Sequence, residues 1–324
     1  MNSKTVYAKT DQGIHQLHRI DDKPIIPNKE EIRLFSCVRN ELCRLPFFID
    51  YHLKKGVDRF FFVDNDSTDE SVNFLLDQPN VHVYSCKESY AASRCGIDWI
   101  NELLRNFGTG HWILALDADE LFLFPYCEDH DYKELSNYLE NEGVQGFETF
   151  MLDMYSDLPI IETKYNPGSS FIDICPYFDI NNYEISKSKK ALPVRGGVRE
   201  RLFWKDQSSY DVIKPPVLHK IPFVRWEEDF EYLASTHQIS KIHLSDTTGV
   251  ILHFKFFSDF IENVFREVER KEHWDGAKQY QIYSKSLESN RNVSLYSDAS
   301  VKFLNTQQLI DLGLMKITSS DYLN

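Results

Sequence analysis

The sequence predicts an α/β protein with a mostly parallel central sheet and helices on both faces. Strand-like and helix-like segments alternate four times in the first half of the chain. Each strand-like run is apolar without a break, as in strands that are buried on both faces. Clusters of polar residues follow three of these runs. In parallel α/β sheets ligands bind at this position, just beyond the carboxyl ends of the strands. Together these observations favour right-handed crossovers around one sheet.

The first half supplies the regular elements of this prediction. Buried strands are expected at residues 32–38, 59–63, 81–84 and 112–116, and helices at 42–55, from about 70, and at 90–107. Gly56 ends the first of these helices, and Ser67 or Thr68 can cap the second. Residues 1–30 form a polar arm or edge element without a strong pattern.

The second half is less regular and rich in loops. A strand is expected at 145–152, long loops at 156–200, broken strand pieces at 203–226 and a last buried strand at 249–257. A helix through residue 271 follows, and the remaining residues look helical and polar. We therefore expect a loop-rich second half followed by C-terminal helices.

Charge and cysteine content exclude several classes of protein. The formal net charge of −14 provides no domain-wide positive field, so we expect no nucleic acid partner. Six cysteines without metal-site spacing favour free thiols in a reducing compartment. No signal-peptide core and no run near about 18 apolar residues is present. These features predict a cytoplasmic protein without a transmembrane segment, and they leave peripheral association with the inner face of the membrane open.

The strongest candidate for a functional site is the stretch 112–124, W-I-L-A-L-D-A-D-E-L-F-L-F. A buried strand here runs into Asp117, Asp119 and Glu120. If the strand continues, Asp117 and Asp119 share one of its sides and Ala118 takes the other. Two like charges at a buried strand end favour a divalent cation that prefers oxygen ligands. The alternative is a strand end whose acids face water.

Polar residues after two other strands should lie near this cluster. Arg39-Asn40-Glu41 and Asp64-Asn65-Asp66 follow the first and second strands. The carboxyl ends of parallel strands meet at one edge, so we expect one crevice. The chain has neither G-x-G-x-x-G after the first strand nor a P-loop. The phosphates of a bound nucleotide would then be held by Mg²⁺ or Mn²⁺ on the carboxylates.

Several motifs resemble those of a known family. C-V-R-N-E-L-C-R-L-P-F-F, F-F-F-V-D-N-D-S-T-D-E-S and H-W-I-L-A-L-D-A-D-E-L resemble the family 2-like glycosyltransferases, which have the Rossmann-like nucleotide-diphospho-sugar transferase fold. M-L-D-M-Y-S-D, R-G-G-V-R-E-R, S-T-H and L-H-F-K-F look like a bacterial branch of it. The resemblance spans about residues 32–280. It implies metal-dependent sugar transfer from a UDP- or GDP-type donor to a glycan or other hydroxyl acceptor, as in surface polysaccharide synthesis.

The resemblance also implies roles for individual residues. The residues that it implies bind the donor are Arg39, Asn40, Glu41, Asp64, Asn65, Arg94 and Asp117. The residues that it implies ligate the metal, Mn²⁺ or Mg²⁺, are Asp117, Asp119 and His253. Lys255 could neutralise a phosphate or extend to the surface. The implied organisation is an arm (1–30), a nucleotide-binding half (31–125), an acceptor-side half of the same domain (126–260) and a C-terminal helical extension (261–324).

The catalytic base is less defined. Asp153, just past a strand, and Glu200, within the basic run 185–205, are the candidates. The best match in this sequence to the E-D pair that usually marks the base in this family is Glu228-Asp229, but the residues around it do not match the family motif well. The basic run around Arg195, with its hinge at Gly196-Gly197, could fold over the donor.

Two other functions remain open. A sugar nucleotidyltransferase would share the fold and the metal carboxylates, but would normally have a glycine-rich loop after the first strand, whereas residues 37–44 contain no glycine. The other is a non-catalytic nucleotide- or sugar-binding protein.

Overall fold

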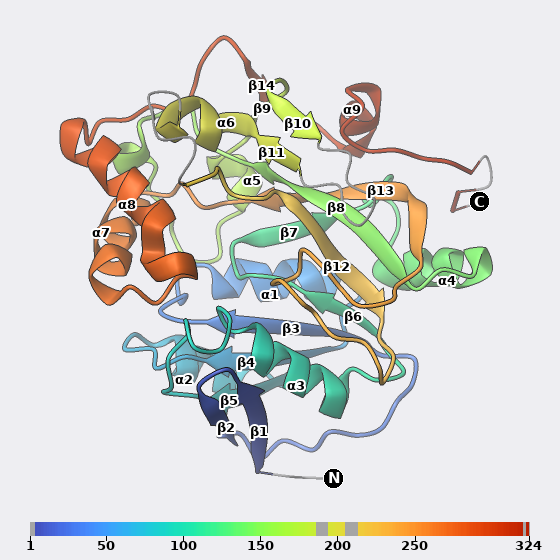
Figure 1. Cartoon of the computed structure of the whole chain (residues 1–324). Helices are drawn as coiled ribbons and strands as arrows, with labels where there is room; N and C mark the ends of the chain where they lie inside the picture. The colour runs from blue at the N-terminus through green and yellow to red at the C-terminus, as the bar shows by residue number, and fades with distance from the viewer. Residues whose placement is uncertain (1–3, 186–193, 205–212, 320–321, 324) are drawn as a thin grey trace.

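The computed structural model describes residues 4–185, 194–204, 213–319 and 322–323 (Figure 1). These residues contain a ten-stranded sheet of order β1-β2-β5-β4-β3-β6-β12-β8-β13-β7. Its strands are β1 (Thr5–Thr10), β2 (Gly13–Arg19), β3 (Ile32–Val38), β4 (Arg59–Asp64), β5 (Val81–Ser85), β6 (Trp112–Ala115), β7 (Glu120–Leu123), β8 (Gly146–Asp153), β12 (His219–Arg225) and β13 (Leu244–His253).

Seven of the ten strands of this sheet point in the same direction, and four of its nine strand pairings are parallel. β3 pairs in parallel with both β4 and β6, β4 with β5, and β8 with β13. The antiparallel strands are β12, which lies between β6 and β8, the edge strand β7, and the β1–β2 hairpin beside β5. The fold class predicted from the sequence is confirmed.

Helices pack on both faces of the sheet (Figure 1). The helices of the described residues are α1 (Leu45–Lys54), α2 (Ser71–Asp77), α3 (Ile97–Phe107), α4 (Tyr132–Glu142), α5 (Phe171–Ile174), α6 (Gly197–Arg199), α7 (Phe260–Arg270), α8 (Trp274–Ser289) and α9 (Thr306–Asp311), and those on the faces of the sheet are α1 to α4. Because strand side chains alternate, Phe60 and Phe62 pack in the core with α1, α2 and α4, whereas Phe61 and Val63 pack in a second core with α3.

The loop-rich half and the C-terminal helices build a third core. Short elements complete this part: η1 (Ile160–Glu162), β9 (Tyr177–Asp179), β10 (Tyr183–Ile185), β11 (Val194–Gly196), η2 (Glu200–Trp204) and β14 (Ser300–Lys302). Phe260 and Val264 of α7 and Tyr283 of α8 pack there against Tyr155 and Trp204. None of the helices in the described ranges is both long and apolar enough to cross a membrane.

The residues before 30 include the β1–β2 hairpin, which forms one edge of the sheet, as the alternative of an edge element predicts. Two other expectations about the elements were wrong. The strand does not continue through Asp117: β6 ends at Ala115, the chain turns, and Glu120 begins the antiparallel strand β7. Side-chain alternation therefore does not place Asp117 and Asp119. Neither Ser67 nor Thr68 caps α2; instead Asp69 Oδ1 accepts a hydrogen bond from the Ser71 N–H at 3.0 Å.

Candidate functional site

A cavity of about 940 Å³ lies at the carboxyl ends of β3, β4 and β6 and is bordered on another side by residues of α7 and α8. This is the crevice expected from the convergence of strand ends. Eight of the residues singled out from the sequence line it, namely Arg39, Glu41, Asn65, Arg94, Asp117, Asp119, His253 and Lys255. The other four, Asn40, Asp64, Asp153 and Glu200, are not among its described lining residues.

Asn40 and Asp64 shape the loop after β4. Asn40 adopts a φ of 55°, its N–H donates to Ser67 Oγ at 2.9 Å, and its side-chain oxygen accepts from the Thr68 N–H at 2.7 Å. Asp64 is buried and accepts from the Ser67 N–H at 3.3 Å, and burial raises the pKa of its carboxyl group. Both side chains therefore hold the loop rather than line the cavity.

Arg39 and Arg94 both reach the cavity, but their surroundings differ. Arg39 donates to the Asn65 carbonyl at 2.6 Å, and no carboxylate in the described ranges pairs with it. Arg94 donates to Asp98 Oδ1 through Nε at 2.9 Å and to the Leu233 carbonyl at 2.9 Å. The charge of Arg94 is already neutralised, whereas the charge of Arg39 is available to an anionic ligand.

The acidic cluster is organised around a buried lysine that sequence reasoning missed. Lys220 Nζ lies 3.1 Å from Asp117 Oδ2 and 2.5 Å from Glu120 Oε1. Glu120 is fully buried and its Oε2 accepts the Asp117 N–H at 3.1 Å, which fixes the turn. Burial raises the pKa of Glu120, and Lys220 opposes that rise. The side chain of Asp117 is 59% exposed and therefore still faces the cavity.

Lys220 reaches the cluster because β12 is irregular. Pro222 lies within the strand and cannot donate to the ladder, and the pairing of β12 with β8 shifts register between Lys220 and Phe223. Such bulges re-aim a side chain. A charged residue next to Ile221 in an apolar strand was the available sequence signal. Its partners are about 100 residues away in the chain, so the sequence alone did not identify them.

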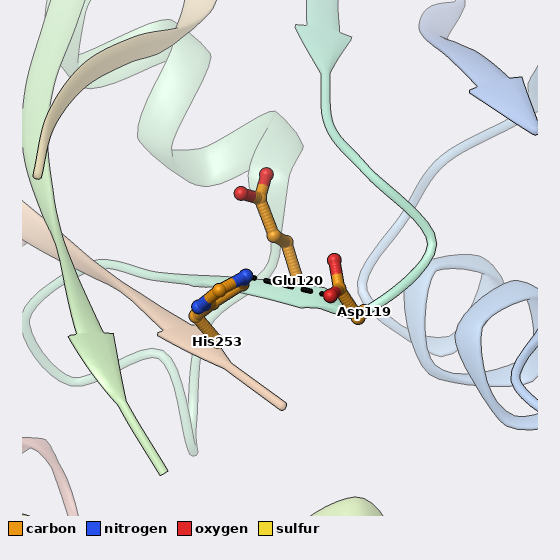
Figure 2. Close-up of side chains that lie close together, drawn as sticks. All are labelled: Asp119, Glu120 and His253. Atoms are coloured by element: carbon orange, nitrogen blue, oxygen red, sulfur yellow. Dashed lines mark ion pairs between the residues drawn. The ribbon is translucent and has the colours of Figure 1, made fainter. Parts of the chain in front are cut away.

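His253 connects the cavity to a buried ion-pair chain. Its Nε2 lies 3.4 Å from Asp119 Oδ2, and its Nδ1 lies 2.6 Å from Asp153 Oδ1. Asp153 Oδ2 in turn accepts from Arg199 Nε at 2.7 Å. Burial opposes charge on His253, but Asp119 and Asp153 outweigh it and raise the pKa of the imidazole. In Figure 2 the dashed line joins His253 to Asp119, with Glu120 beside them.

The donor set fits a divalent cation. One carboxylate oxygen or ring nitrogen from each of Asp119, Glu120 and His253 lies within 4.8 Å of the others. Two ligands about 2.1 Å from one ion lie roughly 3 Å apart, close to the separation of Asp119 Oδ2 and His253 Nε2. Asp153 holds the other ring nitrogen, as a metal-ligating histidine requires. Glu120 was not among the predicted ligands, and Asp117 is drawn toward Lys220.

The two base candidates, Asp153 and Glu200, differ in their surroundings. Both oxygens of Asp153 are engaged, and although burial opposes ionisation, Arg199 and His253 lower the pKa of its carboxyl group. Glu200 begins η2 and is not among the described residues that line the cavity, although its neighbour Arg199 is. The geometry favours a positioning role for Asp153, because both of its oxygens are paired and its lowered pKa makes the carboxylate a poorer proton acceptor.

The described arginines of the basic run 185–205 have separate partners and do not form one cluster. Arg199 is buried against Asp153, Arg201 pairs with Asp179 at 2.8 Å, and Arg195 donates to the Pro215 carbonyl. Residues 186–193 and 205 of this run lie outside the described residues, so folding of the whole run over the donor stays a prediction.

Two further groups border the cavity. Burial raises the pKa of Glu41 to about 7, although Arg44 Nη1 lies 3.2 Å away and opposes the shift. Arg44 is itself held by Asp259 at 2.8 Å. Lys255 donates to the Tyr280 hydroxyl at 3.1 Å, and no carboxylate of the described ranges pairs with it. Lys255 thus presents a second available cation.

The cavity is richer in positive than in negative side chains, in a chain of net charge −14. Among the described lining residues, eleven are basic, namely Arg39, Arg44, Arg94, Arg195, Arg199, Lys214, Lys220, Lys255, Arg266, Arg270 and Lys278. Seven of the described lining residues are acidic, namely Asp11, Glu41, Asp117, Asp119, Glu120, Glu267 and Asp275. An excess of basic side chains in a cavity of an acidic protein favours an anionic ligand.

Comparison with known proteins gives little further information. No protein-family model matches this chain, and no curated protein matches its sequence. A protein from Bacillus anthracis assigned as a glucose-1-phosphate thymidylyltransferase is 9% identical, with 90% of this chain and 98% of that chain covered and a TM-score of 0.31. A UDP-glucose pyrophosphorylase from Acinetobacter baumanii is 10% identical, with 80% and 83% covered and a TM-score of 0.29. Such low scores carry no argument about this chain.

Proposed function

We propose that this protein is a transferase that moves a sugar from a nucleoside-diphosphate sugar to a hydroxyl acceptor. The observation that carries the proposal is the cation-rich cavity of an acidic protein, with the Asp119–His253 pair at the carboxyl edge of the sheet. A diphosphate suits this arrangement because basic side chains and an oxygen-liganded ion can share its charge.

The chain's own residues divide the work in this proposal. Arg39 and Lys255, which lack carboxylate partners in the described ranges, bind the donor phosphates. Asp119 and His253 would hold Mn²⁺ or Mg²⁺, which would supply positive charge to stabilise a leaving diphosphate. Asp153 orients the His253 ring, and Arg199 keeps Asp153 ionised. Asn40 and Asp64 hold the loop that borders the donor pocket.

Nucleotidyl transfer is the second candidate, since a sugar nucleotidyltransferase would use the same metal carboxylates and the same cation-rich cavity. The two reactions release different products. Sugar transfer releases a nucleoside diphosphate from the donor, whereas synthesis of an activated sugar releases pyrophosphate from a nucleoside triphosphate and a sugar phosphate.

One assay separates the candidates. The protein is incubated with Mn²⁺ and either UDP- and GDP-sugars plus glycan acceptors, or nucleoside triphosphates plus sugar 1-phosphates, and both products are quantified. We expect nucleoside diphosphate release that requires metal and is lost in Asp119→Asn. Pyrophosphate release would move the assignment to a nucleotidyltransferase. Donor binding in a thermal-shift assay without either product would indicate a binding protein.

A further inference from the structure

Lys220 is a buried cation inside the cluster that is proposed to hold a metal. Its side chain is 4% exposed, and it ion-pairs with Asp117 and Glu120 rather than with Asp119. A buried lysine is costly unless it is paired, and here two carboxylates pair with it. The ammonium group therefore already balances one of the two carboxylate charges before any divalent ion arrives.

Both oxygens of Glu120 already have partners in this arrangement. Its Oε1 contacts Lys220 Nζ, and its Oε2 accepts the Asp117 N–H at 3.1 Å. Asp119 Oδ2 and His253 Nε2, in contrast, face each other at 3.4 Å. The cluster of three carboxylates thus divides into a pair held by the lysine and one carboxylate beside the histidine.

We propose that Lys220 is a built-in cation that takes the place of a second divalent ion, so that the site admits a single ion on Asp119 and His253. This inference rests on the proposed function only in treating the cluster as a metal site. Without the ammonium group, Asp117, Asp119 and Glu120 would together attract divalent cations more strongly, because uncompensated carboxylates are the ligands of such ions.

The test compares Mn²⁺ binding, measured by thermal shift in the absence of donor, in the wild type and Lys220→Met. We expect the variant to melt at a lower temperature without metal. We also expect Mn²⁺ to raise the melting temperature of the variant further than that of the wild type. The Mn²⁺ midpoint, which is the Mn²⁺ concentration that gives half of the full shift, should be at least about tenfold lower in the variant. Lys220→Arg keeps the charge and should retain the wild-type Mn²⁺ midpoint.

A matched control removes a buried cation elsewhere. Arg33→Met breaks a buried ion pair with Glu31 at the other end of the sheet, and Mn²⁺ should not restore its stability beyond the wild-type shift. Equal Mn²⁺ shifts in Lys220→Met and the wild type would overturn the inference, because a merely structural lysine gives that result. A wild type without any Mn²⁺ shift overturns it as well.

Glu120→Gln provides a second test if Lys220→Met does not fold. Because Lys220 and the Asp117 N–H engage Glu120, the Mn²⁺ midpoint of Glu120→Gln should stay within about threefold of the wild type, whereas Asp119→Asn should abolish the shift. Loss of the shift in Glu120→Gln would show that Glu120 ligates the ion and would overturn the inference. A wild type that binds Mn²⁺ but releases no nucleoside diphosphate refutes the proposed function alone.

Discussion

The two ends of the central sheet both bury charged side chains, yet they differ in access to solvent. At the amino ends of β3 and β4, Glu31 accepts from Arg33 at 2.8 Å and from Arg59 at 2.6 Å, and all three side chains are at most 13% exposed. At the carboxyl ends, Asp117 is 59% and Asp119 21% exposed, and both line the cavity.

The amino-end network is also more nearly saturated. Arg59 contacts His82 at 3.0 Å, His82 contacts Asp21 at 3.1 Å, and Asp21 pairs with Arg19 at 2.7 Å. The carboxyl-end chain from Arg199 to Asp119 instead ends at a carboxylate that a ligand can reach. We call the amino end of the sheet the closed end, because its ion pairs are shielded from solvent, and the carboxyl end the open end, because a ligand can reach its carboxylates. Buried ion pairs therefore serve stability at the closed end and are available for binding at the open end.

Removing one acid at the closed end should cost the most stability. Glu31→Gln leaves Arg33 and Arg59 without their buried carboxylate, so we expect a loss of about 3–5 kcal/mol in the free energy of unfolding. Urea denaturation measures it. Asp50→Asn, which breaks an exposed ion pair with Lys54, is the control and should cost less than about 1 kcal/mol. A Glu31→Gln protein as stable as the control would contradict the distinction.

Removing one acid at the open end should instead cost activity. Asp119→Asn should lower the rate of nucleoside diphosphate release by roughly 10²–10³-fold, as loss of an electrostatic contact to the reacting group does. Its free energy of unfolding should change by less than about 1 kcal/mol, because Asp119 is partly exposed. Initial rates at saturating donor and urea denaturation give both values. Wild-type turnover in this variant would exclude Asp119 from the site.

Weakening the ion pair between Arg199 and Asp153, which contacts His253 but not the proposed metal, should have a smaller effect on the rate. Arg199→Lys loses the planar contact to Asp153, so His253 is held less well, and we expect an activity loss of about 10–100-fold. Arg201→Lys is a matched control in the same segment, since Arg201 pairs with Asp179, which has no recorded contact to His253. Equal losses in the two variants would mean that the effect is structural.

The sequence predicted the parts of the fold that depend on local pattern. The strands β3 and β4 are continuous apolar runs, and the polar residues after them, such as Arg39 and Asn65, do line one cavity. β7 was missed because four apolar residues after an acidic turn are also compatible with a continued strand or a helix.

The partners of the site residues could not be predicted in the same way. Lys220 meets Asp117 and Glu120 only because β12 inserts between β6 and β8 and shifts register at Pro222. The pairing of Asp153 with Arg199 likewise joins residues 46 positions apart. Such contacts depend on strand order and register, which local periodicity does not encode. Asp153 was therefore proposed as a base before its partners were known.

Protonation provides the mildest test of the closed end. His111 precedes β6 and is 8% exposed, with its Nδ1 3.3 Å from the Glu31 carbonyl, and burial lowers its pKa from 6.5 to about 4. The unfolded chain binds this proton below about pH 6.5, whereas the folded protein does so only near pH 4. Its contribution to stability is therefore complete above pH 6.5 and is lost as the pH falls toward 4.

His111→Gln should remove this part of the acid sensitivity. Between pH 7 and pH 5 we expect the wild type to lose about 1–2 kcal/mol more stability than the variant, measured by urea denaturation at each pH. Nucleoside diphosphate release by the folded protein should keep the same pH profile in both, because His111 lies at the closed end of the sheet. A changed pH profile of activity with unchanged stability would show instead that protonation of His111 affects the cavity at the carboxyl end of the sheet.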